Sequence, residues 1–495
     1  MSNPKKGTFL QALIPLAVLV TLLVLNVSYF EDDASYGPNQ IALLLAAAIA
    51  GVIAVINGLK WDDLLNGILK SINQAMPSIL ILMLIGALAG TWLISGIVPA
   101  MIYYGLEILS PKIFLFAACL VCMIVSLATG SSWSTAATVG VALIGIGQAL
   151  GFNVGLVAGA VISGSYFGDK MSPLSDTTNL APAMAGSDLF THIRYMTYTT
   201  VPSIAIALII FLIIGFSASG PGNEGDILAV QTSIQGSFNI SPWLFLVPLI
   251  VIILIIKKVP ALPALLVGVL LGGFVAVTMQ SELILDSNAL SDGESHEPSA
   301  LIDPAYTNGK ASIMVVTQAM FGDVQVVSDN AMVADLLSSS GMMGMMFVIL
   351  LVITAMVFGG MMETGGFLQA IVNIFIHRIK RTTPLVASTA GTCVFFNLTA
   401  SEQYVSIVVP GRMFSSVYDE KNLPPELLSR TLEDSGTVTS VLVPWNSCGA
   451  YHKGVLGVDP IAYLPYCFFN LISPLMSIAV TATGYKIAKK VSKAD

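Results

Sequence analysis

The chain has 495 residues, of which 55% are apolar and only 10% are charged, and its mean hydropathy is +0.84. A soluble protein would carry roughly a quarter charged residues, so the composition excludes a soluble globular protein and predicts helices that face lipid. The net charge of −8 comes from acidic residues concentrated in a few loops, and no basic stripe indicates nucleic-acid binding.

Apolar runs of membrane-spanning length recur along the chain. The first, from Phe9 to Val27, follows Lys5 and Lys6. It lacks a small-residue cleavage site, so we expect a retained first span rather than a cleaved signal peptide. Further runs lie at about 39–59, 77–97, 198–217, 241–256, 260–279, 342–362 and 461–483.

Three other apolar regions, 112–150, 153–182 and 384–452, are interrupted by Gly, Pro, Ser, Thr and Asn. Basic loops are expected inside the cell and acidic loops outside. The loop charges agree with this rule only if 112–150 and 384–416 are re-entrant hairpins. The regions 153–182 and 434–452 then each cross once, as broken helices. We therefore predict ten crossings and two hairpins, with both termini cytoplasmic.

This topology divides the chain into two similar halves of opposite orientation, an architecture common in secondary transporters. We interpret 1–220 as one inverted repeat, 221–240 as a linker and 241–495 as the second repeat, in an all-α polytopic membrane protein. At an offset of 270 residues, Gly90 matches Gly360, Gly96 matches Gly366, Thr129 matches Thr399 and Ser131 matches Ser401; a five-residue shift pairs Asp169 with Asp434.

The acidic insertion at 281–340 is expected to lie outside the cell. We expect its part from Ala311 to Ser340 to form an amphipathic surface helix over the extracellular mouth.

The polar interruptions are where we expect the chemistry, because non-helical backbone at membrane depth is tolerated only where it is buried or lines a cavity. The two hairpin tips and the two helix breaks carry hydroxyl, amide and carboxylate oxygens, which a hard cation such as sodium prefers. The residues expected to coordinate sodium are Thr129, Ser131, Ser132, Ser134, Thr135, Ser172, Ser175, Thr177, Asn179, Asn397, Thr399, Ser401, Ser435, Thr437, Thr439 and Asn446.

Carboxylates in these regions indicate an ion site more specifically than the hydroxyl and amide side chains do. A charge near the bilayer centre costs at least ~2.5–3.5 kcal/mol, so such a residue is rarely present without a role. Burial disfavours the charged form, so an empty site should hold a proton and a bound cation should displace it. One carboxylate alternating between proton and sodium would then explain antiport. In order of expected importance, the candidates are Asp169, Asp434, Asp176 and Glu402.

Several polar residues also have plainer interpretations. Each Ser or Thr hydroxyl can instead bond its own helix backbone. Lys170 can form a structural ion pair with Asp169. We expect Glu433 at the membrane interface with Arg430, and His452 as an interfacial histidine.

The five cysteines, Cys119, Cys122, Cys393, Cys448 and Cys467, all fall in apolar segments. We expect them to be small buried hydrophobes rather than metal or redox ligands.

Two motifs carry a family resemblance: Gly130-Ser-Ser-Trp-Ser-Thr-Ala-Ala-Thr-Val-Gly140 and Gly168-Asp-Lys-Met-Ser-Pro-Leu-Ser-Asp-Thr-Thr-Asn-Leu-Ala-Pro182. They closely resemble the NhaC family of sodium/proton antiporters, and the resemblance spans essentially the whole chain. It implies a bacterial cytoplasmic-membrane protein with two hairpins, two broken helices, an elevator-like movement and a homodimeric assembly.

Sodium/proton exchange is therefore the predicted function, with sodium as substrate, surrounding lipid as partner and no cofactor. Relatives of the family that exchange malate and lactate make a sodium- and proton-coupled organic-acid exchanger the alternative. Such a site needs a cation for the substrate carboxylates. The two hairpin tips and the two helix breaks contain Lys170 and no arginine, and Arg412 lies beyond the second hairpin tip. We also considered a membrane-embedded enzyme and a channel; no catalytic motif favours an enzyme, and buried carboxylates suit coupled exchange better than conduction.

Overall fold

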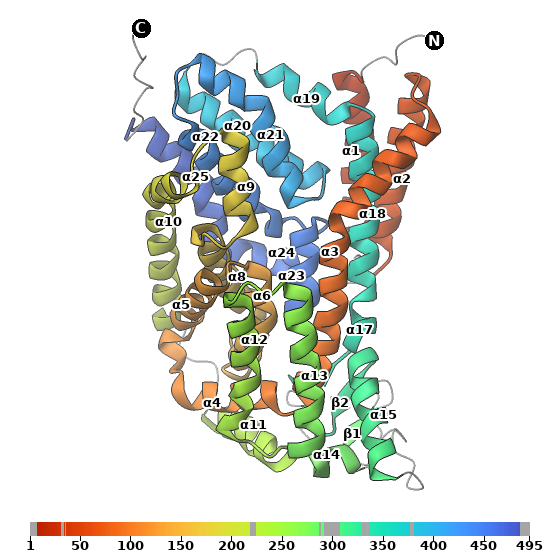
Figure 1. Cartoon of the computed structure of the whole chain (residues 1–495), viewed down its shortest axis with the longest axis vertical. Coiled ribbons are helices and arrows are strands. Elements are labelled where there is room, and N and C mark those ends of the chain that lie inside the picture. The colour runs from red at the N-terminus through yellow and green to blue at the C-terminus, as the bar shows by residue number, and fades with distance from the viewer. Residues whose placement is uncertain are drawn as a thin grey trace.

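Helices make up nearly all of the computed structural model, which describes residues 7–30, 34, 36–217, 224–286, 289–291, 307–328, 334, 336–376 and 381–485 (Figure 1). Among these residues, seven helices are long and apolar enough to cross a membrane, and two bent helix pairs bring the number to nine. The predicted class, an all-α multi-pass membrane protein, is confirmed. The ten crossings and their orientation stay predictions, and Lys5 and Lys6 lie outside the described residues.

The first half of the chain forms three long helices, a short helix, a hairpin and an interrupted helix, and ends in another long helix. The turn of π-helix η2 continues directly into α7. The elements are α1 (Phe9–Phe30), α2 (Pro38–Ile56), α3 (Trp61–Ile94), α4 (Ile97–Ile108), α5 (Pro111–Thr129), α6 (Ser132–Thr135), η2 (Ala136–Gly140), α7 (Val141–Ala149), α8 (Val154–Met171), α9 (Asp176–Ala185) and α10 (Leu189–Ser217).

The middle of the chain contains two apolar helices, α12 and α13, and the elements of the insertion. α11 lies at 89° to the segment that contains α12. The elements are α11 (Glu224–Ser237), η3 (Pro242–Phe245), α12 (Leu246–Ile256), α13 (Ala261–Met279), α14 (Ser281–Leu285), β1 (Leu290–Ser291), α15 (Asn308–Phe321), β2 (Val324–Val326), β3 (Ser338–Ser339) and α17 (Gly341–Gly344).

The last part of the chain again forms a hairpin followed by an interrupted helix. The interruption begins with a turn of π-helix, η4, and continues through a short 3-10 turn, η5. The elements are α18 (Met346–Thr364), α19 (Phe367–Ile376), α20 (Thr382–Thr399), α21 (Gln403–Glu420), α22 (Pro425–Leu432), η4 (Glu433–Thr437), η5 (Ser440–Leu442), α23 (Ser447–Leu456), α24 (Pro460–Tyr463), η6 (Leu464–Tyr466) and α25 (Phe468–Ala482).

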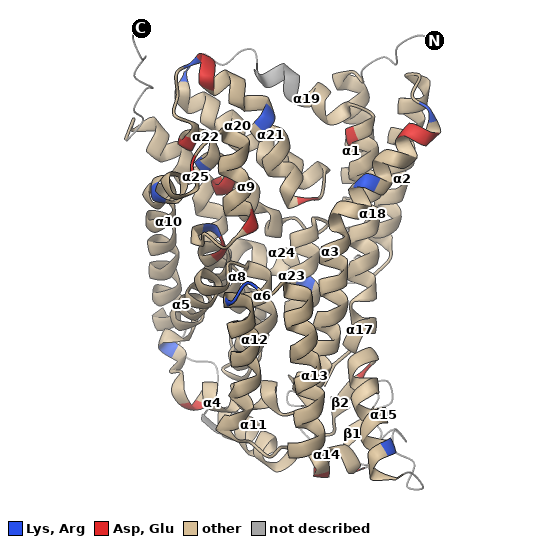
Figure 2. Cartoon of the chain, in the orientation of Figure 1, with Lys and Arg blue, Asp and Glu red and all other residues tan. Residues whose placement is uncertain are grey.

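The two ends of the molecule carry different parts of the chain (Figure 1). α1 begins and α25 ends at one end, where α19, α20 and α22 also lie, whereas α14, α15 and the strands lie at the other. Charged residues lie toward the two ends, and a further group lies inside, around α8, α9 and α22 (Figure 2). That interior group is unusual for such an apolar chain and directs attention to the helix interruptions.

The insertion corrects one prediction. The helix expected from Ala311 to Ser340 ends at Phe321, and β2 pairs antiparallel with β1 and β3 in a three-stranded sheet. The alternation of buried Val324 and Val326 with a polar residue between them is the period of a strand, not of a helix. α15 also packs on α3: a side chain at Gly90 would meet the Ala319 carbonyl at 1.7 Å.

Both predicted hairpin segments fold back on themselves. At the open end of the first, the rings of Phe114 and Phe152 stack with centroids 5.5 Å apart. In the second, the Thr389 and Tyr418 hydroxyls lie 3.2 Å apart. The first tip turns at Gly130 and the second at Ser401, both with positive φ. Which membrane face each hairpin enters stays a prediction.

Element boundaries recur at a nearly constant separation along the chain. α4 begins at Ile97 and α19 at Phe367, 270 positions later, each after a left-handed glycine. The interrupted helices begin 271 positions apart, at Val154 and Pro425, and their second halves also begin 271 positions apart, at Asp176 and Ser447.

Because the interrupted helices begin and resume at the same separation of 271 positions, they align without the five-residue shift that paired Asp169 with Asp434. That pairing is therefore wrong. Asp169 lies seven positions before Asp176, whereas Asp434 lies thirteen positions before Ser447. The two aspartates therefore occupy different levels of their interrupted helices.

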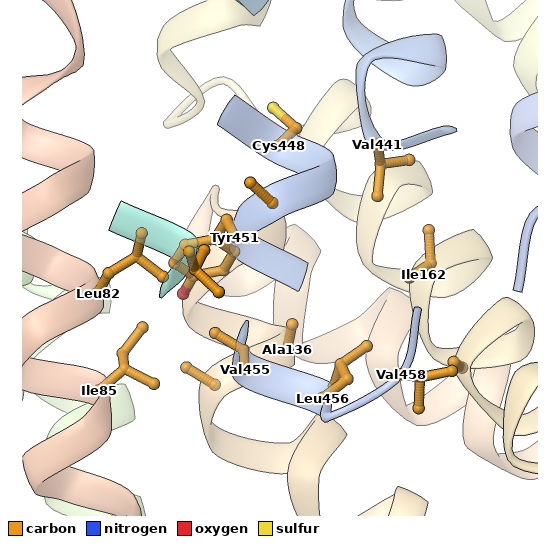
Figure 3. Close-up of a cluster of buried hydrophobic side chains, with 14 of the residues drawn as sticks. Leu82, Ile85, Ala136, Ile162, Val441, Cys448, Tyr451, Val455, Leu456 and Val458 are labelled. Atoms are coloured by element: carbon orange, nitrogen blue, oxygen red, sulfur yellow. The ribbon is translucent and has the colours of Figure 1, made fainter. Parts of the chain in front are cut away.

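Apolar packing fixes the segment that follows the second break. Leu82 and Ile85 of α3 are buried near Tyr451 and Val455 of α23, whereas Ile162 of α8 lies toward Val441 and Val458 (Figure 3). Because interiors are close-packed, α23 is held against α3 and α18. Its N-terminal end, capped by Asn446, is thereby held beside Asn397 of the second hairpin.

Candidate functional site

Each hairpin tip and each helix break ends in a capped helix start. Ser, Asn and acidic side chains are good N-caps because their oxygens accept from otherwise unpaired backbone N–H groups. Helix N-termini also carry partial positive charge, which repels a cation. Carboxylates close to these helix ends are therefore needed to make a cation site favourable. In the first tip and the first break, Ser131 Oγ accepts from Ser134 N at 3.1 Å and Ser175 Oγ accepts from Thr178 N at 3.4 Å. In the second tip and the second break, Glu402 Oε1 accepts from Tyr404 N at 3.4 Å and Asn446 Oδ1 accepts from Cys448 N at 3.1 Å.

Asp169, near the end of α8, joins the first hairpin tip to the first break. Its side chain is 6% exposed. Oδ2 accepts from the backbone N–H of Ser132 at 3.1 Å and from the Ser132 hydroxyl at 2.6 Å. Oδ1 has no hydrogen-bond partner. One carboxylate oxygen is therefore held in place, and the other is available to a proton or a cation.

A cavity of about 680 Å³ opens beside Asp169. Both hairpin tips and the first break line it, together with part of α3 and the connection between α12 and α13. The second break does not line it. Of the residues predicted for the site, those that line the cavity are Thr129, Ser131, Ser134, Asp169, Asp176, Asn179 and Glu402.

Two further carboxylates face this cavity from different halves of the chain. Glu402 is 3% exposed, and its Oε2 has no partner. Asp176 accepts a short hydrogen bond from the Tyr404 hydroxyl, so the second tip is bonded to the first break. Nothing in the sequence singled out Tyr404, although it stands two positions after Glu402 in the hairpin tip.

Lys258 is another cavity-lining residue that the sequence interpretation missed. It lies in the connection between α12 and α13 and has a positive φ of 64°. The loop-charge interpretation treated it as a topological marker only. The structure places its exposed side chain in the wall shared with Asp169, Asp176 and Glu402.

Asp434 is surrounded by basic and hydroxyl groups, away from the cavity. Lys170 donates a short hydrogen bond to Oδ1, and Arg430 Nε lies 3.8 Å from Oδ2. Thr199 and Ser473 hydroxyls also bond Oδ1, at 3.2 and 3.3 Å. The expected ion pair between Lys170 and Asp169 is therefore wrong, because the end of α8 packs against η4, α10 and α25.

Glu433 is fully buried, so the interfacial position expected for it is wrong. Its Oε1 accepts from the Thr177 hydroxyl at 3.0 Å, and its Oε2 has no partner. Arg430, its expected companion, instead lies beside Asp434 and over the Tyr195 ring, 4.9 Å from the centroid.

The interfacial position expected for His452 is also wrong. It is fully buried on α23, where Nδ1 lies 2.8 Å from the Cys448 carbonyl and the ring lies 5.5 Å from that of Tyr166. All five cysteines are free and buried, as predicted.

Four of the predicted sodium-coordinating hydroxyls are bonded to their own helices, and Thr129 donates to the Ser126 carbonyl three positions earlier, at 3.5 Å. Thr135, Thr399 and Thr439 each donate to the carbonyl four positions earlier, at 2.9, 2.8 and 2.6 Å. This is the ordinary behaviour of hydroxyls in helices. Among the predicted sodium-coordinating residues, the buried hydroxyls without a hydrogen-bond partner are those of Ser401, Ser435 and Thr437.

The predicted amide ligands hold the interruptions together. Asn397 donates to the Gly436 carbonyl at 2.8 Å, and Asn446 donates to the Asn397 carbonyl at 3.1 Å. In the first break, Asn179 donates to the carbonyls of Pro173 and Ser175, at 3.0 and 2.6 Å. Ser172 accepts from the backbone of the same break.

A multi-pass helical fold whose polar cavity reaches buried carboxylates is typical of membrane transporters. The model of the Na+/H+ antiporter family matches residues 164–290 and 305–485. The chain belongs to this family, as the resemblance to NhaC proteins predicted.

Relatives cover nearly the whole chain. The Na(+)/H(+) antiporter NhaC of Alkalihalophilus pseudofirmus is 35% identical over 99% of both chains. The malate-2H(+)/Na(+)-lactate antiporter of Bacillus subtilis is 34% identical over 98% of this chain and 96% of its own. The arginine/ornithine antiporter ArcD of Halobacterium salinarum is 35% identical over 98% of this chain and 94% of its own. All three are named as antiporters rather than enzymes.

Proposed function

We propose that this protein exchanges sodium for protons by alternating access, at a mid-membrane site built on Asp169. The observation that carries the proposal is the unpartnered Asp169 Oδ1 beside the cavity. A buried carboxylate without a cation partner is strongly disfavoured in its charged form. It therefore holds either a proton or a metal cation, and competition between the two couples their movements.

Charge compensation distinguishes the carboxylates. Within the part of the chain that the structure describes, Asp434 has two basic neighbours, whereas no salt bridge reaches Asp169 or Glu402. In this proposal sodium takes Asp169 Oδ1, nearby hydroxyls and backbone carbonyls of the first tip. Glu402 and Asp176 supply negative potential that attracts cations into the cavity.

The transport movement in this proposal is elevator-like and uses two inverted repeats, 1–220 and 241–495, joined by 221–240. The recurring element boundaries and the four capped helix starts support the repeats. The moving part would carry both hairpins and both interrupted helices, while the remaining helices would form the scaffold of a homodimer. We place both termini on the cytoplasmic side of a bacterial inner membrane, with the insertion outside.

A second candidate is sodium- and proton-coupled organic-acid exchange, and Lys258 is the observation that favours it. Small-molecule sites occupy about 300–1,000 Å³, so a cavity of about 680 Å³ has room for a small organic acid. Lys258 is the kind of cation that a substrate carboxylate needs, and it lies in a cavity wall. Lys170 is not available for this role, because it is buried against Asp434.

Proteoliposomes that contain a pH-sensitive dye distinguish the two candidates. We expect added sodium alone to move protons in the wild-type protein and to have no effect in the Asp169→Asn variant. Proton movement that requires malate or lactate would favour the organic-acid exchanger instead. Sodium-driven proton movement that persists in Asp169→Asn would remove Asp169 from the mechanism.

A further inference from the structure

We propose that Glu433 is the second carboxylate ligand of the sodium site and that Asp434, its neighbour in sequence, is not a ligand. This inference rests on the proposed sodium/proton exchange and adds a residue to that site. Glu433 is contributed by the second half of the chain, so the site would be shared between the halves.

The first turn of α9 connects Glu433 to Asp169. The Thr177 hydroxyl donates to Glu433 Oε1 at 3.0 Å, and the Thr178 hydroxyl donates to the Asp169 carbonyl at 3.2 Å. Ser175 Oγ, which caps the same turn, lies 3.1 Å from Thr177 Oγ1. Ser175, Thr177 and Thr178, three polar positions in one helix turn, thus link the two carboxylate-bearing segments.

Both segments that this turn connects carry buried oxygen atoms without hydrogen-bond partners. Asp169 Oδ1 and Glu433 Oε2 are buried without hydrogen-bond partners, and so are the hydroxyls of Ser435 and Thr437 in η4. Buried polar atoms are nearly always paired, so such a set needs an explanation. All four are oxygens, which is the ligand chemistry that a hard cation takes.

The π-helical turn separates the two consecutive acids. Asp434 bonds Thr199 of α10 and Ser473 of α25, whereas Glu433 bonds Thr177 of α9. The two carboxylates therefore contact different elements. π-helical turns occur frequently at functional sites, where they redirect individual side chains.

The basic residues favour the same assignment. Lys170 and Arg430 both lie against Asp434, and this compensates its charge and makes it a poor ligand for another cation. No salt bridge to Glu433 occurs among the described residues. Asp434 Oδ2 also lacks a hydrogen-bond partner, but Arg430 Nε lies 3.8 Å from it. Of the two neighbours, Glu433 is therefore the one whose unpartnered oxygen has no salt bridge among the described residues, and it is the one we assign to sodium.

Sodium binding to the purified full-length protein tests this assignment through sodium-dependent thermal stabilisation and isothermal titration. Glu433→Gln keeps the size of the side chain and an acceptor for Thr177 but removes the charge. We expect it to fold and to lose at least about tenfold in sodium affinity. Glu426→Gln, the same change in the preceding helix α22, is the matched control and should bind sodium as the wild-type protein does.

Wild-type sodium affinity in Glu433→Gln, together with lost binding in Asp169→Asn, would overturn the assignment and leave sodium/proton exchange standing. Absence of sodium binding in the wild-type protein would instead refute the proposed function. If Glu433→Gln does not fold, sodium affinity is measured in Thr177→Val instead, which removes the hydrogen bond that positions Glu433. A weaker sodium affinity in that variant supports the assignment, and an unchanged affinity rejects it.

Discussion

Asp169 and Asp434 lie in the two interrupted helices, yet their surroundings are opposite. Asp169 lies beside a cavity with one oxygen unpartnered, whereas Asp434 is enclosed by Lys170, Arg430 and two hydroxyls. A carboxylate in a broken helix is thus not sufficient to define an ion site. Access and charge compensation decide whether such a group exchanges cations or stabilises the fold.

Removing a basic partner of Asp434 should give the largest effect on stability. Lys170→Met leaves a buried carboxylate with Arg430 alone, and breaking a buried pair in this way costs about 3–5 kcal/mol. Thermal unfolding in detergent measures the loss. Lys453→Met is the control, because Lys453 pairs with a partly exposed Asp459 and such pairs contribute about 1 kcal/mol or less. Equal losses in the two variants would contradict the role assigned to Asp434.

Disrupting the contact between the first tip and the first break should have the next largest effect. A Cβ atom at Gly130 would lie 2.6 Å from Leu174 Cβ and 2.9 Å from Ser175 N. Gly130→Ala should therefore displace the tip from Asp169. We expect it to weaken sodium-driven exchange at least tenfold. Gly186→Ala is the matched control: its φ is also positive, but no atom lies within 4 Å. Both variants share a left-handed backbone cost of about 1–2 kcal/mol. Exchange that falls equally in both would show that backbone strain alone is responsible.

The bond between Tyr404 and Asp176 should have the smallest effect. Tyr404→Phe removes one hydrogen bond, worth about 0.5–1.5 kcal/mol, so we expect a change of several-fold in the KM for sodium. Tyr418→Phe, which removes a hydroxyl contact with Thr389 within the second hairpin, should leave that KM unchanged. Wild-type transport kinetics in Tyr404→Phe would show that the bond does not influence access to the cavity.

Much of the fold followed from local features of the sequence. Apolar runs predicted the long helices, because helical spans in lipid must be continuous and apolar. Gly130 and the Ser-Pro pair at 172–173 marked a tip and a break, because both interrupt helix geometry. The predicted helix from 311 to 340 failed at Gly322, where two short strands take up the chain.

The site was harder to predict, because its groups are defined by contacts between distant segments. Asp169 and Glu402 carried a signal as carboxylates in interrupted apolar regions. The sequence could not show that Lys170 pairs with Asp434 across 264 positions. Nor could it show that a π-helical turn places Glu433 against Thr177, since no local pattern marks such a turn.

Proton release on sodium binding tests the central role of Asp169 most directly. Isothermal titration of the purified protein with sodium, repeated in two buffers of different ionisation enthalpy, measures the protons released. We predict release by the wild-type protein, and neither binding nor release in Asp169→Asn, while Asp169→Glu retains part of both. Undiminished sodium binding with proton release in Asp169→Asn would contradict this account.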